Sequence, residues 1–187
     1  MNSARTLADR FRTQRADRIR VDGVEVLSLV EVDLAPDELV EILLEQSRAD
    51  VDQALNLRSA QGDLVAVPDS EKSMDSGVED DELGFETITV LAPRSTGAAL
   101  TGIGDVHQTL QLWNSWVVGA AHHAWTGNSG IVLEQLEVPE GAKDRIRLWC
   151  SDGLGNPQFD DLVAIVTVGP RQNAIEDWLS QPSSEEE

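Results

Sequence analysis

The chain has 187 residues, enough for one domain with its own core, and 41% of them are hydrophobic, which excludes wholesale disorder. Its 34 acidic and 14 basic residues give a formal net charge of −20, and the single cysteine, Cys150, excludes disulfide frameworks and cysteine-ligated zinc. No apolar run is long enough for a transmembrane helix, and no apolar segment follows the basic N-terminus as in a secretory signal, so we expect a cytoplasmic protein.

The N-terminal segment differs from the rest in charge. Residues 1–20 contain six arginines and two aspartates, a net charge of +4, so the remainder carries −24. Leu7, Phe11 and the Ala4/Ala8 pair share one stripe at helical spacing, which predicts an amphipathic helix over residues 4–18. We therefore divide the chain into a basic N-terminal helix or arm (1–20), one domain (21–180) and a disordered acidic tail (181–187).

The next segments alternate between strand and helix signals. The turn pair Asp22-Gly23 precedes a run rich in β-branched residues, which predicts a strand over 24–32. Residues 36–57 begin with Pro-Asp-Glu and place apolar side chains at spacings of three and four, so they predict a helix. Residues 63–67 predict a short strand.

A polar stretch interrupts the domain at residues 68–84. It has almost no apolar content, so it predicts an exposed, disordered acidic loop. Residues 85–92 then predict a strand by their β-branched content. The glycine-rich connection that follows lacks the spacing of a phosphate-binding or dinucleotide-binding loop, so no nucleotide cofactor is expected.

Residues 105–126 show apolar side chains at spacings of three and four, with Asp105 and Gln108 as a possible capping box and Gly127 as a stop signal. An extended interpretation places Leu110, Leu112, Trp116 and Val118 on one side but leaves Asn114 among them. The pattern therefore favours a helix.

The phrases Ala-Ala-His and Gly-Asn-Ser-Gly occur near each other around His123 and Ser129, as they do separately in chymotrypsin-like proteases. In those enzymes the histidine and serine lie far apart in sequence with an aspartate between them. Here they are six residues apart without one, so residues 126–130 are interpreted as a turn. The histidines His107, His122 and His123 lack the spacing of a metal site, and we expect neither a catalytic residue nor a metal.

Three tryptophans crowd the same region. Trp113 and Trp116 lie on the apolar stripe of the expected helix and are assigned to the core. Trp125 lies beside a polar turn, so it is the better candidate for contact with a partner.

The C-terminal part predicts a β-meander with strands over 130–138, 144–150 and 159–168, followed by a short helix containing Ile175, Trp178 and Leu179. Cys150 lies on the apolar face of its strand and is interpreted as a small core residue. The loop between the last two strands supplies oxygen ligands from Asp152, Asn156, Asp160 and Asp161, but without the spacing of a calcium loop. Turn formation is the favoured interpretation, and no metal is expected.

These segments together predict a single α+β domain with an antiparallel-rich sheet and three to four helices. No nucleophile–base pair, metal constellation or phosphate loop is recognisable, so we expect a non-catalytic protein. A carboxylate pair assembled in three dimensions remains open, because the chain has so many acids.

The charge suggests what the protein binds. The acidic body repels nucleic acid and membrane surfaces and attracts a basic protein, as an immunity protein or antitoxin does when it neutralises a toxin. The expected partner-binding residues are Glu79, Asp80, Asp81, Glu82 and Trp125. The alternative function is a structural subunit of a homomeric or phage-type assembly, in which residues 1–20 contact a neighbouring copy. A simpler origin of the acidity, in solubility or adaptation to salt, stays open beside both.

Overall fold

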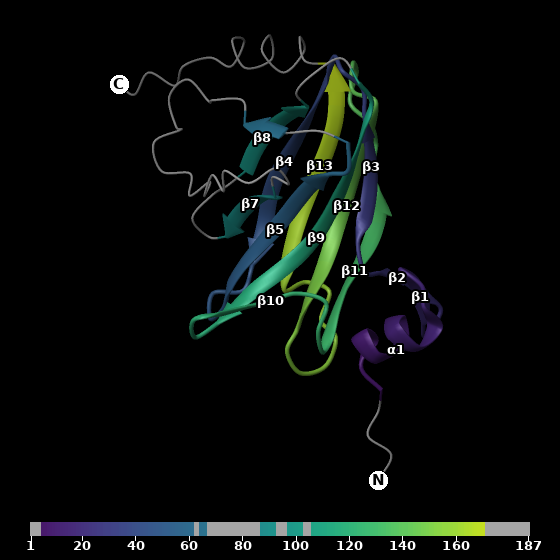
Figure 1. Ribbon diagram of the computed structural model, residues 1–187, viewed down its shortest axis with the longest axis vertical. Coiled ribbons are helices and arrows are strands. Elements are labelled where there is room, and N and C mark those ends of the chain that lie inside the picture. The colour runs from purple at the N-terminus through teal and green to yellow at the C-terminus, as the bar shows by residue number, and fades with distance from the viewer. Residues whose placement is uncertain (1–4, 62–63, 67–86, 93–96, 103–105, 171–187) are drawn as a thin grey trace.

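The computed structural model describes residues 5–61, 64–66, 87–92, 97–102 and 106–170. Strands make up 61% of the structure and helix 6%, so the predicted α+β class with three to four helices is wrong. The protein is instead a β-sandwich, in which two antiparallel sheets pack face to face, and one short helix lies at the end that bears the N-terminus (Figure 1).

The larger sheet has eight strands in the order β1 (Arg18–Val21), β2 (Val24–Leu27), β11 (Asn128–Gln135), β12 (Asp144–Gly153), β13 (Leu162–Pro170), β4 (Glu38–Ser47), β8 (Gly97–Gly102) and β6 (Leu64–Ala66). The smaller sheet has the order β10 (Ala121–His123), β9 (Gln108–Val118), β5 (Asp52–Ser59) and β7 (Thr87–Ala92), and β3 (Val30–Leu34) also pairs with β9. The two sheets are covalently linked at Ser28 and Leu29, where the chain leaves β2 and enters β3.

The core lies between the sheets and follows the period of two that extended chains impose. In β9 every second residue from Gln108 to Trp116 is buried, and the intervening residues are partly exposed. The inward-facing residues form one apolar cluster that includes Val40, Ile42, Leu55, Leu57, Leu110, Leu112, Ile131, Leu148, Leu162 and Ala164. Burial of this cluster supplies the main favourable term in folding.

The expected helix over residues 36–57 is wrong. The segment forms β4, a turn and β5, and β5 pairs with β7 on one side and β9 on the other. In β5 the side chains of Gln53, Leu55 and Leu57 point inward at a spacing of two. The amide of Gln53 hides this alternation when only apolar residues are counted, whereas the leucines and valines happen to fit a helical spacing.

The expected helix over residues 105–126 is also wrong, and Asn114 explains why. The segment forms β9 and β10, joined by a hairpin turn. Asn114 does point into the sandwich, with only 2% of its surface exposed, but its Nδ2 donates a hydrogen bond of 2.8 Å to the carbonyl of Ser151. A buried amide is tolerated when it is hydrogen-bonded, so its polarity does not argue against a strand.

Several other predictions are confirmed. The N-terminal helix exists but is shorter than expected, α1 (Leu7–Gln14), and strands are present near each of the segments 24–32, 63–67, 85–92, 130–138, 144–150 and 159–168. The run 24–32 divides into β2 and β3, and β1 and β8 were not expected. The acidic loop 68–84, the helix around Ile175, Trp178 and Leu179, and the tail 181–187 lie outside the described residues. Among the residues described, no helix is long and apolar enough to cross a membrane.

Candidate interaction site

Helix α1 is fixed against the end of the sandwich by its first turn. Thr6 caps the helix by accepting a hydrogen bond of 3.2 Å from the backbone N–H of Asp9. The first two N–H groups of the helix find acceptors elsewhere in the chain. The N–H of Leu7 donates to Asn128 Oδ1 at 3.1 Å, and the N–H of Ala8 donates to the carbonyl of Gly127 at 3.0 Å. The side chains of Leu7 and Ala8 are buried. Helix α1 is therefore docked on the turn that leads into β11.

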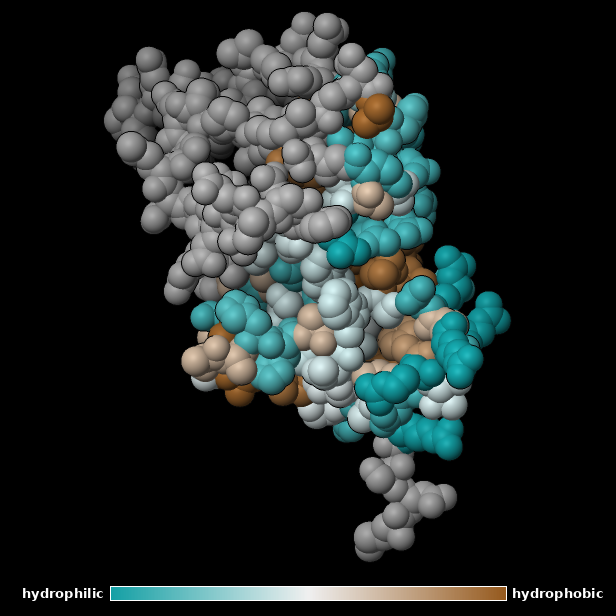
Figure 2. All heavy atoms as spheres, viewed as in Figure 1, coloured by the Kyte–Doolittle hydropathy of each residue, from teal (hydrophilic) through white to brown (hydrophobic). Residues whose placement is uncertain are grey.

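A groove of about 360 Å³ separates α1 from the β10–β11 connection. Its lining residues are Ala8, Phe11, Arg12, Arg15, Ala16, Asp17, Ser28, Leu29, Trp125 and Ser129. Arginines border the groove on the helix side, and apolar side chains provide much of the remaining wall. Figure 2 shows this combination at the lower right, where apolar surface lies beside the strongly hydrophilic residues of α1. We call this feature the α1 groove.

Trp125 stands at the rim of the α1 groove in a fixed orientation. Its backbone is left-handed, with φ 54°, and its Nε1 donates a hydrogen bond of 3.1 Å to the carbonyl of Ser28. Its ring stacks on that of Trp113 with centroids 5.2 Å apart, yet 49% of the residue is exposed. The left-handed backbone costs about 1–2 kcal/mol at a non-glycine residue, and the hydrogen bond and ring stacking help to offset it.

The structure therefore separates the three neighbouring tryptophans. Trp116 is in the core, as expected, with 2% exposed, and its ring stacks on His123. Trp113 is not a core residue, because it lies half-buried on the outer face of β9 under Trp125. Trp125 is exposed where a partner could reach it. The other four expected partner-binding residues, Glu79, Asp80, Asp81 and Glu82, lie outside the described residues.

Unpaired positive charge is concentrated around α1. Of the six arginines in residues 5–20, Arg12 pairs with Asp9 and Arg18 pairs with Glu25. The other four, Arg5, Arg10, Arg15 and Arg20, form no ion pair within the described part of the chain. Arg5 and Arg10 line a second hollow on the other side of α1, of about 440 Å³. The surroundings of Trp125 are thus basic, whereas the sequence led us to expect it on an acidic surface.

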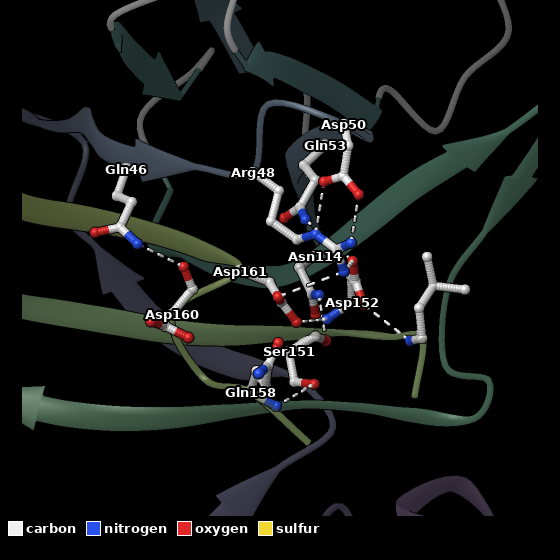
Figure 3. Close-up of polar contacts among 11 residues, drawn as sticks. Gln46, Arg48, Asp50, Gln53, Asn114, Ser151, Asp152, Gln158, Asp160 and Asp161 are labelled. Carbon is white, nitrogen blue, oxygen red and sulfur yellow. Dashed lines mark hydrogen bonds and ion pairs between the residues drawn. The ribbon is translucent and has the colours of Figure 1, made fainter. Parts of the chain in front are cut away.

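A separate cluster of charges is buried near the turn between β4 and β5 (Figure 3). Asp152, at the end of β12, and Asp161, just before β13, are 0% and 3% exposed, and the backbone N–H of Asp152 donates to Asp161 Oδ2 at 3.0 Å. Arg48 lies over both, with Nη1 2.9 Å from Asp152 Oδ2 and 3.7 Å from Asp161 Oδ1. Its Nη2 also pairs with Asp50 at 2.7 Å. One guanidinium therefore contacts two buried carboxyl groups and one exposed carboxylate.

Asp152 and Asp161 are a carboxyl pair that the fold brings together. Burial raises the pKa of Asp161, as active-site carboxyls often require, and the hydrogen bond with Asp50 is the largest of the interactions that raise the pKa of Arg48. The Arg48 guanidinium, however, already contacts both carboxyl groups. Among the expected oxygen ligands, Asp152 and Asp161 are brought together while Asn156 and Asp160 are exposed. No group of three or more potential metal ligands occurs within the residues described.

The Arg48 cluster makes stability depend on pH. Replacing Arg48 with methionine removes a charge that lowers the pKa of Asp161, so that pKa rises further above its unfolded value. A carboxyl group whose pKa is raised by folding binds its proton more tightly in the folded protein. It therefore destabilises the fold fully at high pH. This destabilisation shrinks as pH falls below the raised pKa and is gone below the unfolded pKa. Asp50 acts in the same direction, because Arg48 lowers its pKa only in the native protein.

We therefore expect the stability difference between wild type and Arg48→Met to be largest near about pH 7.5 and to narrow near about pH 5. Urea unfolding at the two pH values measures this. The matched control is Arg58→Met, because Arg58 is exposed, donates a side-chain hydrogen bond to Gln111 and forms no ion pair with a buried acid in the described structure. A difference that is constant with pH, or that widens on acidification, would contradict the assignment of Arg48 as counter-charge.

The remaining candidate residues are placed as structural elements. The turn expected over residues 126–130 is present only at its start, because β11 begins at Asn128 and contains the buried Ser129. The N–H of Ser129 donates to the carbonyl of Thr126 at 3.1 Å. No hydrogen bond joins Ser129 to His123 in the described structure, and His123 stacks on Trp116 instead. Cys150 is fully buried in the core as expected, and burial raises the pKa of its thiol.

Comparison with protein-family models, with curated proteins and with solved structures gives no match to this chain.

Proposed function

We propose that the protein is a non-catalytic structural subunit that assembles with copies of itself. The basic residues 5–20 of one copy, which we call the α1 region, bind the acidic surface of the next. The observation that carries this proposal is the separation of unpaired charge. The α1 region has four arginines without ion pairs, and the rest of the described sandwich has an excess of acids. One molecule therefore carries both halves of a complementary pair of surfaces.

The sandwich cannot neutralise its own acids. Three of the five basic side chains described in the sandwich already form ion pairs. Arg48 pairs with Asp50, Asp152 and Asp161. Lys143 pairs with Glu38, and Arg147 pairs with Glu45 and Glu134. Several exposed acids form no ion pair within the described residues, namely Asp22, Asp37, Asp52, Glu137, Glu140 and Asp160. Their charge is available to the α1 region of another copy.

The geometry of such a contact is head-to-tail, since the two surfaces differ. Interfaces of this kind close into rings or extend into filaments. Complementary potentials steer association and fix which surfaces meet, and salt screens them over about 8 Å at physiological ionic strength. Phe11, Leu29 and Trp125 in the α1 groove add apolar contact area that charge alone does not provide.

A second candidate function is an acidic binding protein that neutralises a basic partner, as an immunity protein or antitoxin does. The charge of −24 on residues 21–187 favours it. It differs from the first in that the free protein is a monomer and the α1 region plays no part in binding.

Sedimentation velocity across a salt series distinguishes the two functions. We expect the wild-type chain to sediment as a large species at low salt and to dissociate as salt rises, because screening weakens a charge-driven interface. Arg15→Glu should weaken association at least about fivefold, since it replaces attraction with repulsion at the groove. The matched control, Arg58→Glu, reverses one exposed arginine on β5 and should leave association unchanged.

Two results would contradict the assembly. A chain that is monomeric at every salt concentration has no self-association to explain. Equal loss of association in Arg15→Glu and Arg58→Glu would show that net charge, and not the α1 region, governs it. A salt-independent monomer that captures a basic protein would favour the second candidate function.

A further inference from the structure

We propose that the α1 groove binds the acidic segment 79–85 of a second copy of this chain. The inference rests on the proposed assembly and names the segment that occupies the groove. The groove has two kinds of wall, and each restricts the chemistry of the occupant.

The charged wall is basic. Arg12 and Arg15 are exposed at the groove, and Arg15 has no ion pair among the residues described. Asp17 also lines the groove and accepts a hydrogen bond of 3.0 Å from the hydroxyl of Ser28, so the two arginines exceed the acids among the lining residues by one charge. Arg10, which is partly exposed, lines the hollow on the opposite side of α1. An occupant with several carboxylates is therefore favoured over a neutral or basic one.

The other wall is apolar and aromatic. Phe11 and Leu29 are partly buried in it, and the exposed ring of Trp125 borders it. The Nε1 of Trp125 is already used by the carbonyl of Ser28, so the ring offers mainly its face and edges to a ligand. An occupant should therefore place large apolar side chains close to its carboxylates.

One segment of the chain combines both properties. Residues 79–85 read Glu-Asp-Asp-Glu-Leu-Gly-Phe, four consecutive acids followed at once by leucine and, two residues later, by phenylalanine. The C-terminal triplet 185–187 is acidic but has no apolar residue next to it. Residues 176–179, Glu-Asp-Trp-Leu, have half the charge. The segment 79–85 therefore matches the groove best.

The strand pairing favours a segment from another copy. Phe85 lies two residues before Thr87, the first residue of β7, so it can extend only about 7 Å from it. Across the smaller sheet, Thr87 of β7 pairs with Arg58 of β5, and Arg58 pairs with Gln111 of β9. Gln111 in turn pairs with Glu31 of β3. Three strand spacings, about 14 Å, therefore separate Thr87 from β3. The groove residue Leu29 precedes Glu31 by two residues, just before the start of β3. A second copy can present Phe85 to the groove while β7 stays paired, so we assign the occupant to another copy.

Fluorescence anisotropy of a labelled peptide with the sequence of residues 77–87 tests this pairing. The host is the full chain with Glu79→Gln, Asp80→Asn, Asp81→Asn and Glu82→Gln, so that its own segment does not compete. We expect saturable binding that weakens at least tenfold when Arg12→Glu and Arg15→Glu are added to the host. Binding should also weaken at least tenfold for a peptide with serine in place of Leu83 and Phe85. The control host carries Arg58→Glu and should bind like the parent.

Several outcomes would overturn the inference. They are absence of binding, equal binding by the host with reversed Arg12 and Arg15, and tighter binding of a peptide of residues 174–187. Failure here is distinct from failure of the proposed function. If the chain still assembles in a salt-dependent way through Arg15 but the 77–87 peptide does not bind, the assembly stands and its occupant is another acidic surface. If the peptide binds as expected to a chain that remains monomeric, the groove assignment is supported and the assembly is not.

Discussion

Replacing Asp152 with alanine is expected to lower the free energy of unfolding by about 3–5 kcal/mol, because it breaks a buried charge network by removing one partner. The side chain of Asp152 is fully buried and accepts hydrogen bonds from Arg48 at 2.9 Å, from Gln53 at 3.3 Å and from the backbone of Leu154 at 2.8 Å. With alanine at this position, the Gln53 amide and the Leu154 N–H lose this hydrogen-bond acceptor. Arg48 loses one of the carboxyl groups that pair with it. Chemical denaturation at neutral pH measures the loss.

Two further variants separate charge from packing. Asp160→Ala removes a neighbouring carboxylate that is exposed and forms no ion pair in the described structure, so its effect should stay within about 0.5 kcal/mol. Asp152→Asn keeps the shape and an acceptor but removes the charge, so it should be less harmful than alanine. If Asp152→Ala proves as mild as Asp160→Ala, the buried cluster does not stabilise the sandwich and our account of Arg48 fails with it.

Substituting alanine at Gly153 is expected to cost about 3 kcal/mol or more, from a strained backbone and a steric clash together. Gly153 has φ 85°, and a Cβ there would lie 2.5 Å from the carbonyl oxygen of Thr126 and 2.7 Å from Cη2 of the buried Trp116. Neither a turn backbone nor a core ring can move away easily. The same clash would push on the turn that carries Trp125, so binding at the α1 groove should weaken as well.

Gly155 provides the matched control in the same loop. It has φ 71°, but a Cβ there would meet nothing within 4 Å. Gly155→Ala should therefore show only the cost of the left-handed backbone, about 1–2 kcal/mol. Thermal unfolding of the two variants gives the comparison. Equal losses would mean that the contact between Gly153, Thr126 and Trp116 is not tight in solution.

The strands that could be predicted from the sequence are those whose own residues show a strand pattern. Residues 24–32, 130–138 and 144–150 are rich in β-branched residues or alternate cleanly, and strands are present there. Residues 36–57 and 105–126 were misassigned because Gln53, Asn114 and other inward polar residues break the apolar alternation. Their hydrogen bonds, such as that from Asn114 to the carbonyl of Ser151, come from a strand distant in sequence. A local pattern cannot show that such a partner exists.

The candidate site was predictable only in part for the same reason. Trp125 was singled out by its position beside a polar turn, and it is exposed. The loop around Asp152 and Asp161 was recognised as rich in carboxylates. Arg48 could not be assigned to them, because it lies 104 residues before Asp152 in the chain. The α1 groove likewise depends on Phe11, Leu29 and Trp125 meeting across three separate elements.

Site-specific cross-linking at position 125 tests the central claim, that the α1 groove binds another copy of the chain. A photoreactive phenylalanine analogue replaces Trp125, and the variant is mixed with isotopically heavy wild-type chain at low salt before irradiation. Mass spectrometry then identifies the cross-linked peptides. We expect light–heavy cross-links from position 125 to residues 79–85, and their loss when Arg12 and Arg15 are changed to glutamate. Cross-links confined to the light chain itself, or light–heavy cross-links that persist unchanged in the glutamate variant, would contradict the account.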